Sequence, residues 1–104
     1  MEIIHLLKVD SFINELEDEL RIKVDKVIDL LSQKEWYISM PFSKSLGEGL
    51  FELRINSNPP IRIFYCYYNN KIYLLHIIEK KRPDIPPREI DRARKLQRML
   101  LQNR

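Results

Sequence analysis

The sequence contains little cysteine, glycine or histidine, the residues that small proteins use for disulfides, tight turns and metal sites. Among its 104 residues are one cysteine (Cys66), two glycines and two histidines. A single cysteine excludes an internal disulfide and is typical of a protein of the reducing cytoplasm. The two histidines, His5 and His76, are distant in sequence and with one cysteine give no usual metal-ligand spacing. We therefore expect no metal and no other cofactor.

Long apolar runs are also absent. No run approaches the roughly 18 residues that cross a bilayer. The first residues lack the basic stretch and apolar core of a secretory signal. These features predict a cytoplasmic protein without a membrane segment. The length fits one domain, residues 1–104, with a single hydrophobic core.

Charge is distributed unevenly along the chain. Residues 1–35 carry nine acidic and five basic side chains, a balance of −4. Residues 36–104 carry six acidic and thirteen basic side chains, a balance of +7. A basic C-terminal part indicates an anionic partner, with nucleic acid as the first candidate. The alternative is a basic face that serves only solubility.

The region between residues 50 and 78 has the pattern of consecutive β-strands. Apolar and polar residues alternate in its first part, and β-branched and aromatic residues dominate the rest. Residues 56–60 form a breaker between the first two strands. Asn69 and Asn70 predict a two-residue type I′ turn, because asparagine tolerates the positive φ that this turn requires. The predicted strands are Leu50–Ile55, Ile61–Tyr68 and Ile72–Ile78.

The N-terminal third predicts a short strand followed by helices. Glu2–Leu7 contains a short apolar run typical of a strand, and Asp10 or Ser11 is suited to cap the next helix. Apolar residues then recur at helical spacing as far as Leu31, without an interrupting glycine or proline. The acidic residues 17–19 favour a second helix start. We expect a helical pair that covers one face of the sheet.

The segments that flank the predicted strands are expected to be irregular, apart from a basic helix at the end. Trp36–Phe42 is an aromatic-rich connection, and residues 43–49 predict a loop that holds Lys44 near the sheet. Prolines within residues 83–87 break the chain before the final helix, whose apolar stripe is spaced at helical intervals. Asp84 has two interpretations: it caps this helix, or it lowers the positive potential of the basic residues before it.

Four runs of the sequence share one order and register from about residue 40 to residue 95. They are Pro41-x-x-Lys44-x-Leu46-Gly47-x-Gly49-Leu50-Phe51-Glu52-Leu53-Arg54, Arg62-Ile63-Phe64-Tyr65, Leu74-Leu75-His76-x-x-x-Lys80-Lys81 and Pro86-x-x-Glu89-Ile90-x-x-Ala93. Together these runs resemble the phage-derived HigB-like toxins of the RelE superfamily.

The resemblance implies an α+β, RelE-like (microbial-ribonuclease-like) fold. In that fold an N-terminal strand and a helical pair pack on a mostly antiparallel sheet, with a basic C-terminal helix. It also implies the toxin of a type II toxin–antitoxin system, an endoribonuclease that cuts mRNA on the ribosome without a metal. A cognate antitoxin, expected to be of the helix-turn-helix type, would neutralise it. The alternative from the residues themselves is a nucleic-acid- or protein-binding module without catalysis.

Metal-free RNA cleavage uses the ribose 2′-OH as nucleophile and needs stabilisation of the charge on the phosphate. Arg54 and Arg62 are the first catalytic candidates, because a guanidinium fork holds two phosphate oxygens at once. We expect both arginines to face outward, opposite each other on neighbouring strands. The alternative is that they pair with Glu52 or Glu79. Lys81 is a further catalytic candidate, at the end of the last strand.

His76 is the remaining catalytic candidate, because histidine exchanges protons near neutral pH. The hairpin register counted from the Asn-Asn turn places it beside Ile63 and Tyr65 rather than Arg62, which favours a structural histidine. Four further residues are candidates for binding RNA, by phosphate contact or by stacking on a base. They are Lys44, Tyr65, Lys80 and Arg82. The alternatives are a basic strand end that serves solubility and a tyrosine that belongs to the core.

Overall fold

The computed structural model describes residues 1–34 and 42–102, which form an α+β fold. The elements in chain order are β1 (Glu2–His5), α1 (Leu7–Asn14), α2 (Asp18–Lys34), β2 (Ser43–Gly47), β3 (Leu50–Ile55), β4 (Ile61–Tyr68), β5 (Lys71–Glu79) and α3 (Pro87–Gln102). This is the fold class that the sequence predicts, and the arrangement is consistent with a RelE-like fold. Of the predicted connection Trp36–Phe42, all but Phe42 lies outside the described residues.

The sheet has five strands in the order β1-β5-β4-β3-β2. β1 runs parallel to β5, and the other neighbouring pairs are antiparallel. β3 and β4 have the predicted bounds, and β5 is one residue longer at each end. Asn69 and Asn70 have φ angles of 54° and 62°, so the predicted turn is confirmed.

The prediction that residues 43–49 form a loop is wrong. Ser43–Gly47 is an edge strand that pairs with β3, with Lys44 opposite Glu52. The turn to β3 has positive φ at Gly47, Glu48 and Gly49. The local sequence has low β propensity, so pairing with an apolar neighbour strand decides the conformation here.

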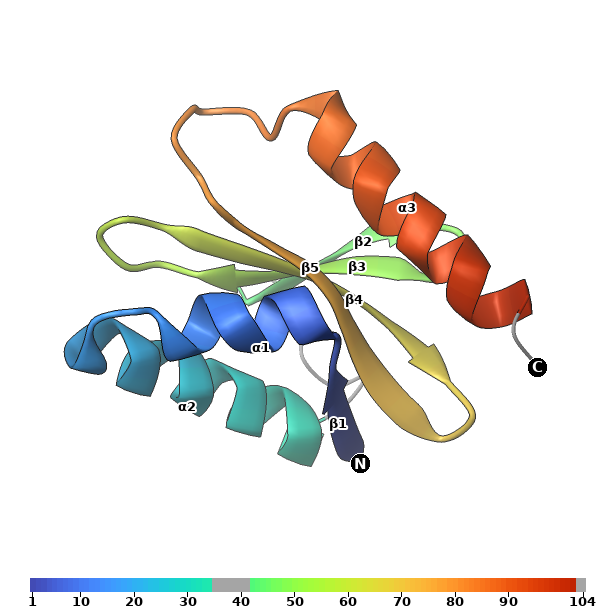
Figure 1. Cartoon of the computed structure of the whole chain (residues 1–104), viewed down its shortest axis with the longest axis horizontal. Helices are drawn as coiled ribbons and strands as arrows, with labels where there is room; N and C mark the ends of the chain where they lie inside the picture. Colours follow the sequence, from blue (N-terminus) through green and yellow to red (C-terminus); the bar gives the residue numbers. More distant parts are fainter. Residues whose placement is uncertain (35–41, 103–104) are drawn as a thin grey trace.

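Different helices cover the two faces of the sheet (Figure 1). α1 and α2 pack on one face, where Val9, Val24 and Leu31 contact a core that includes Leu53 and Ile63 of the strands. We call this the two-helix face. α3 packs on part of the opposite face, the α3 face, where Ala93 meets a smaller core of strand residues. Those strand residues are Leu50, Phe64, Cys66, Leu75 and Ile78.

The predicted helical pair is confirmed, but the prediction that Asp10 or Ser11 caps the first helix is wrong. α1 begins at Leu7 with Leu6 in the N-cap position and no side-chain cap. Leu6 donates its backbone N–H to the Leu74 carbonyl (3.1 Å), so the chain leaves β1 and enters the helix without a linker. Pairing with β5 therefore places the helix start ahead of Asp10 and Ser11.

None of the helices in the described part of the chain is both long and apolar enough to cross a membrane.

Candidate nucleic-acid interface

A bulge in β5 decides which face of the sheet carries His76. The register pairs Tyr65 with Leu74 and Phe64 with His76, so Leu75 has no partner of its own in β4. An extra residue of this kind reverses the alternation of side chains that follow it. The predicted position of His76 beside Ile63 and Tyr65 is therefore wrong. His76 stacks on Phe64 of the α3 face, with ring centroids 5.9 Å apart, on the same side as Arg54 and Arg62.

Arg54 and Arg62 are directly opposite each other in the β3–β4 register, as the sequence predicts. Glu52 lies between their charges. Its Oε1 is 3.2 Å from Nε of Arg54, and its Oε2 is 3.7 Å from Nε of Arg62. The alternative expectation, that the arginines pair with Glu52, is thus confirmed. We call Glu52, Arg54 and Arg62 the arginine cluster.

Arg62 is buried, with 6% of its surface exposed, so the expectation of an outward-facing side chain is wrong. Its Nη1 donates to the carbonyl of Ile61 (2.9 Å) and, at 3.5 Å, to that of Ile55. Its Nε is buried and has no hydrogen-bond partner within the described residues. Burial lowers the pKa of Arg62, partly opposed by the charge of Glu52 and reinforced by Arg54. An Arg62→Ala change would therefore test folding as well as RNA contact.

Lys80, Lys81 and Arg82 follow the end of β5 and form what we call the basic segment. Lys80 donates its backbone N–H to the Pro60 carbonyl (2.8 Å), which fixes the start of the segment beside the β3–β4 loop. None of the three cations forms an ion pair within the described residues. The arginine cluster differs in this respect, because both of its arginines pair with Glu52.

The basic segment separates two surface cavities. One, of about 500 Å³, lies toward the β3–β4 loop and reaches the buried Arg62; it contains no acidic side chain. The other, of about 440 Å³, extends along β5 to α1 and the start of α3. The residues from other elements that line it include Phe12, Arg88 and Glu89. The structure thus brings Arg62, Lys80, Lys81, Arg82 and His76 together around one segment.

His76 has an acidic partner that the sequence pattern did not indicate. Its Nε2 lies 3.0 Å from Oε1 of Glu89 in the first turn of α3. Both side chains are mostly buried, and this contact joins the bulged part of β5 to α3. The contact with Glu89 therefore supports the interpretation of His76 as a structural histidine. A role in proton transfer stays a prediction.

Two predicted RNA-binding residues have different outcomes. Lys44 is exposed on the edge strand and faces the same side as Glu52. Tyr65 is 1% exposed, packs in the core of the two-helix face and shares a hydrogen bond of 2.6 Å with Ser43. Burial raises its pKa, although the bond to Ser43 opposes the shift. Stacking of Tyr65 on a base is incompatible with this position, so this assignment is wrong.

Asp84 is exposed and lies outside the final helix. α3 begins at Pro87, and Glu89 donates its backbone N–H to Pro86, so Pro86 takes the cap position. The capping interpretation of Asp84 is therefore wrong. The other interpretation, an acid that reduces the positive potential near the basic segment, stays open.

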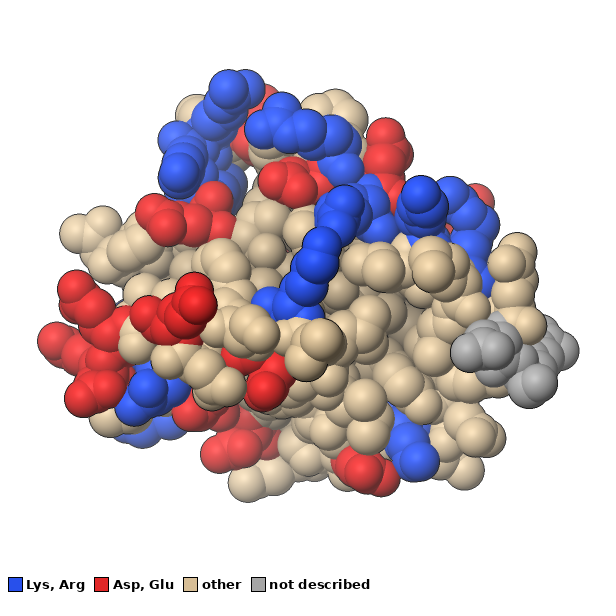
Figure 2. All heavy atoms as spheres, viewed as in Figure 1, with Lys and Arg blue, Asp and Glu red and all other residues tan. Residues whose placement is uncertain are grey.

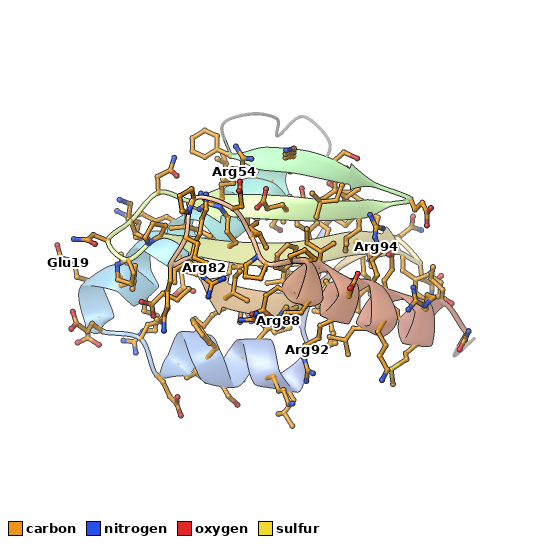
Figure 3. All side chains as sticks on the ribbon, turned by 90° about the horizontal axis from the view of Figure 1, so that it is seen from above. Glu19, Arg54, Arg82, Arg88, Arg92 and Arg94 are labelled. Carbon is orange, nitrogen blue, oxygen red and sulfur yellow. The ribbon has the colours of Figure 1, made fainter. Side chains whose placement is uncertain are left out.

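Sequence reasoning missed Glu89, Arg88 and Phe12 as neighbours of the basic segment. Phe12 belongs to the apolar stripe of the first helix, and nothing in its local sequence distinguishes it from core. Arg88 and Arg92 project from α3 on the side of α1, whereas Arg94 points toward β3 and β2 (Figure 3). Arg94 donates there to the carbonyls of Leu46 and Gly47, so it serves the fold.

The surface charge follows the uneven distribution along the sequence. Acidic side chains gather around the turn between α1 and α2, and basic ones along α3 and the segment before it (Figure 2). Within residues 1–34 and 42–102, no three His, Cys, Asp or Glu side chains are placed to hold a metal ion. Beside the basic segment, the titratable pair is that of His76 and Glu89.

These features define a small α+β protein with a cationic surface at the end of a mixed sheet. The model of the family described as Phage derived protein Gp49-like (DUF891) matches residues 11–98, and the chain belongs to this family. A comparison with curated protein sequences finds no match.

Proposed function

We propose that this protein is the toxin of a bacterial type II toxin–antitoxin system, similar to the HigB-like members of the RelE superfamily. In this proposal it is a metal-independent endoribonuclease that cuts mRNA on the ribosome and is neutralised by a cognate antitoxin. The observation that carries the proposal is the basic segment, whose three cations form no ion pair within the described residues and line cavities on both sides. Membership of a phage-derived family and the α+β fold support it.

The roles of the residues follow from what RNA cleavage requires. Lys80 and Arg82 hold the phosphates on either side of the cut, because neither forms an ion pair within the described residues and Arg82 is exposed. Lys81 and Arg62, which line the same cavity, stabilise the charge that develops on the reacting phosphate. His76 takes part in proton transfer, and Glu89 holds its ring. Arg54 supports Arg62 through their shared carboxylate.

A second candidate is a binding module without catalysis. It is favoured by one observation: the buried cation of the site is already matched by Glu52, and the histidine by Glu89. A phosphate would have to compete with a carboxylate that is held in place by the fold. RNA or protein would then bind at the basic segment without being cut.

Inducible expression in bacteria distinguishes the two candidates. For the toxin, we expect growth arrest and new mRNA ends inside translated regions, both abolished when an antitoxin gene is co-expressed. A Lys81→Ala variant should lower cleavage about 10²-fold, whereas Lys8→Ala, an exposed lysine of α1, should not. Normal growth and intact mRNA, together with RNA binding by the purified protein, would support the binding module instead. Cleavage of naked RNA by the purified protein would show that the reaction does not require the ribosome, and that part of the proposal would be wrong.

A further inference from the structure

One edge of the sheet is paired over only part of its length. β1 pairs with β5 from Lys71 to Leu74 and then ends at His5, because the chain turns into α1. Beyond Leu74, residues 75–79 of β5 have no strand beside them on that edge within the described part of the chain. At about 3.3 Å per residue, this open edge has room for an extended segment of about five residues.

The open edge offers backbone hydrogen bonds. Lys80 directs its N–H toward the β4 side, where it bonds to Pro60. Alternate residues of a strand direct their backbone groups to opposite edges, so Glu79 and Ile77 direct theirs to the open edge. Both residues line the cavity of about 440 Å³. No backbone bond from either residue across this edge is formed within the described residues.

The cavity along this edge has a definite chemical character. Phe12 of α1 supplies an apolar wall, and the charged lining consists of four cations (Lys80, Lys81, Arg82, Arg88) and two carboxylates, Glu79 and Glu89, of which Glu89 contacts His76. None of these cations forms an ion pair with another described residue. An extended peptide bonds to a strand edge through its backbone and places alternate side chains on either side. The complementary occupant is an extended segment with acidic and apolar side chains.

We propose that the open edge of β5 is the docking site of an extended acidic segment of a partner protein, which adds to the sheet in line with β1. The segment would lie over the basic segment and His76, and would exclude RNA from both. The identification of this partner as a neutralising protein rests on the proposed function. The docking itself does not depend on it.

A peptide of alternating glutamate and valine tests the docking on the whole purified protein. We expect it to bind and to slow amide hydrogen exchange of Ile77 and Glu79, measured by NMR. A peptide of the same sequence with every backbone nitrogen methylated keeps the charge but cannot donate to a strand. We expect it not to bind. Equal binding of the two peptides would overturn the proposal, because charge alone would then explain the interaction.

Two matched variants test the place of docking. Arg88 and Arg92 are both exposed on α3, but only Arg88 lines the cavity. We expect Arg88→Glu to weaken peptide binding about tenfold and Arg92→Glu less than about twofold. Equal effects would place the peptide elsewhere. If single-stranded RNA binds and slows exchange at Ile77 and Glu79 while the peptide does not, the edge is a nucleic-acid surface and the proposal is wrong.

The outcome is separable from that of the proposed function. A protein that binds the peptide but neither arrests growth nor cuts mRNA refutes the toxin and leaves the docking site intact. A protein that cuts mRNA but does not bind the peptide refutes the docking site alone.

Discussion

The arginine cluster and the basic segment lie at the same end of the sheet, yet they hold their charges in opposite ways. In the cluster, Glu52 is 2% exposed and balances two guanidiniums, one of them buried. In the basic segment, Lys81 and Arg82 are exposed, Lys80 is half-buried, and none of the three forms an ion pair within the described residues. A charge that the fold has buried must be matched within the protein, because desolvation is costly. An exposed charge remains available to a partner. The cluster therefore contributes to the stability of the sheet, whereas the basic segment is not held by charge pairing of its own.

The largest expected effect is the loss of the carboxylate that balances the arginine cluster. We expect Glu52→Gln to lower the free energy of unfolding by about 3 kcal/mol, because Arg62 would remain buried without its counter-charge. Urea denaturation measures this. The control is Glu79→Gln, an exposed glutamate of β5, which should change stability by less than about 0.5 kcal/mol. Equal effects of the two variants would mean that the cluster is not held by its charges.

Denaturation at alkaline pH tests the burial of Cys66 in the core of the α3 face. Burial raises the pKa of the Cys66 thiol to about 11. The unfolded thiol ionises at about 8.5, so between this pH and about 11 the folded state holds a proton that the unfolded state has lost. Stability must therefore fall as pH rises through this window, by about 3 kcal/mol. A Cys66→Ala variant should show less of this fall in urea denaturation at pH 8 and pH 10.5. An identical fall would assign it to other groups.

Removal of lysines from the basic segment should affect binding and not stability. We expect Lys80→Ala/Lys81→Ala to leave the melting temperature unchanged and to lower RNA affinity about tenfold. The slope of log affinity against log salt should become shallower by about 1.4, which is about 0.7 for each phosphate of single-stranded RNA that the protein no longer neutralises. The matched pair Lys8→Ala/Lys26→Ala removes exposed lysines of α1 and α2. An unchanged slope in the first pair would assign these lysines to solubility.

The smallest expected effect is at Asp84, which is exposed two positions beyond the basic segment. Because α3 is capped at Pro86, Asp84→Lys should not change stability. It should raise RNA affinity about two- to threefold, since it adds positive potential near the phosphates. Asp29→Lys makes the same charge change on α2 and serves as control. A melting temperature lowered by several degrees would contradict the cap assignment.

The strands were predictable where the local sequence itself favours the conformation that pairing with the neighbouring strands requires. Residues 50–55 and 61–68 combine β-branched and aromatic residues with clear breakers, and the Asn-Asn turn fixes its own geometry. β2 was not predictable, because its serine, lysine and glycine residues become a strand only through pairing with β3. The start of α1 is decided in the same way, by the bond between Leu6 and Leu74.

The candidate site was predictable in composition but not in geometry. The positions of the cations follow from the strands, and the opposition of Arg54 and Arg62 follows from the register. The burial of Arg62 depends on Glu52 and on the carbonyls of Ile55 and Ile61, which no local pattern indicates. The bulge at Leu75 carries no glycine or proline signal either, so a count of residues from the turn put His76 on the wrong face.

That bulge has a consequence for aligning this chain with its relatives. Consider a relative whose fifth strand lacks the extra residue. If its strand were aligned with this one from the turn without a gap, its residue equivalent to His76 would be aligned with Leu75 instead. The gap belongs opposite Leu75, since the pairs on both sides of it are in register with β4. A deletion of Leu75 should accordingly restore simple alternation and leave His76 opposite Phe64, on the α3 face. The extra residue is thus accommodated locally, and the residues on both sides of it keep the same partners in β4 with or without it.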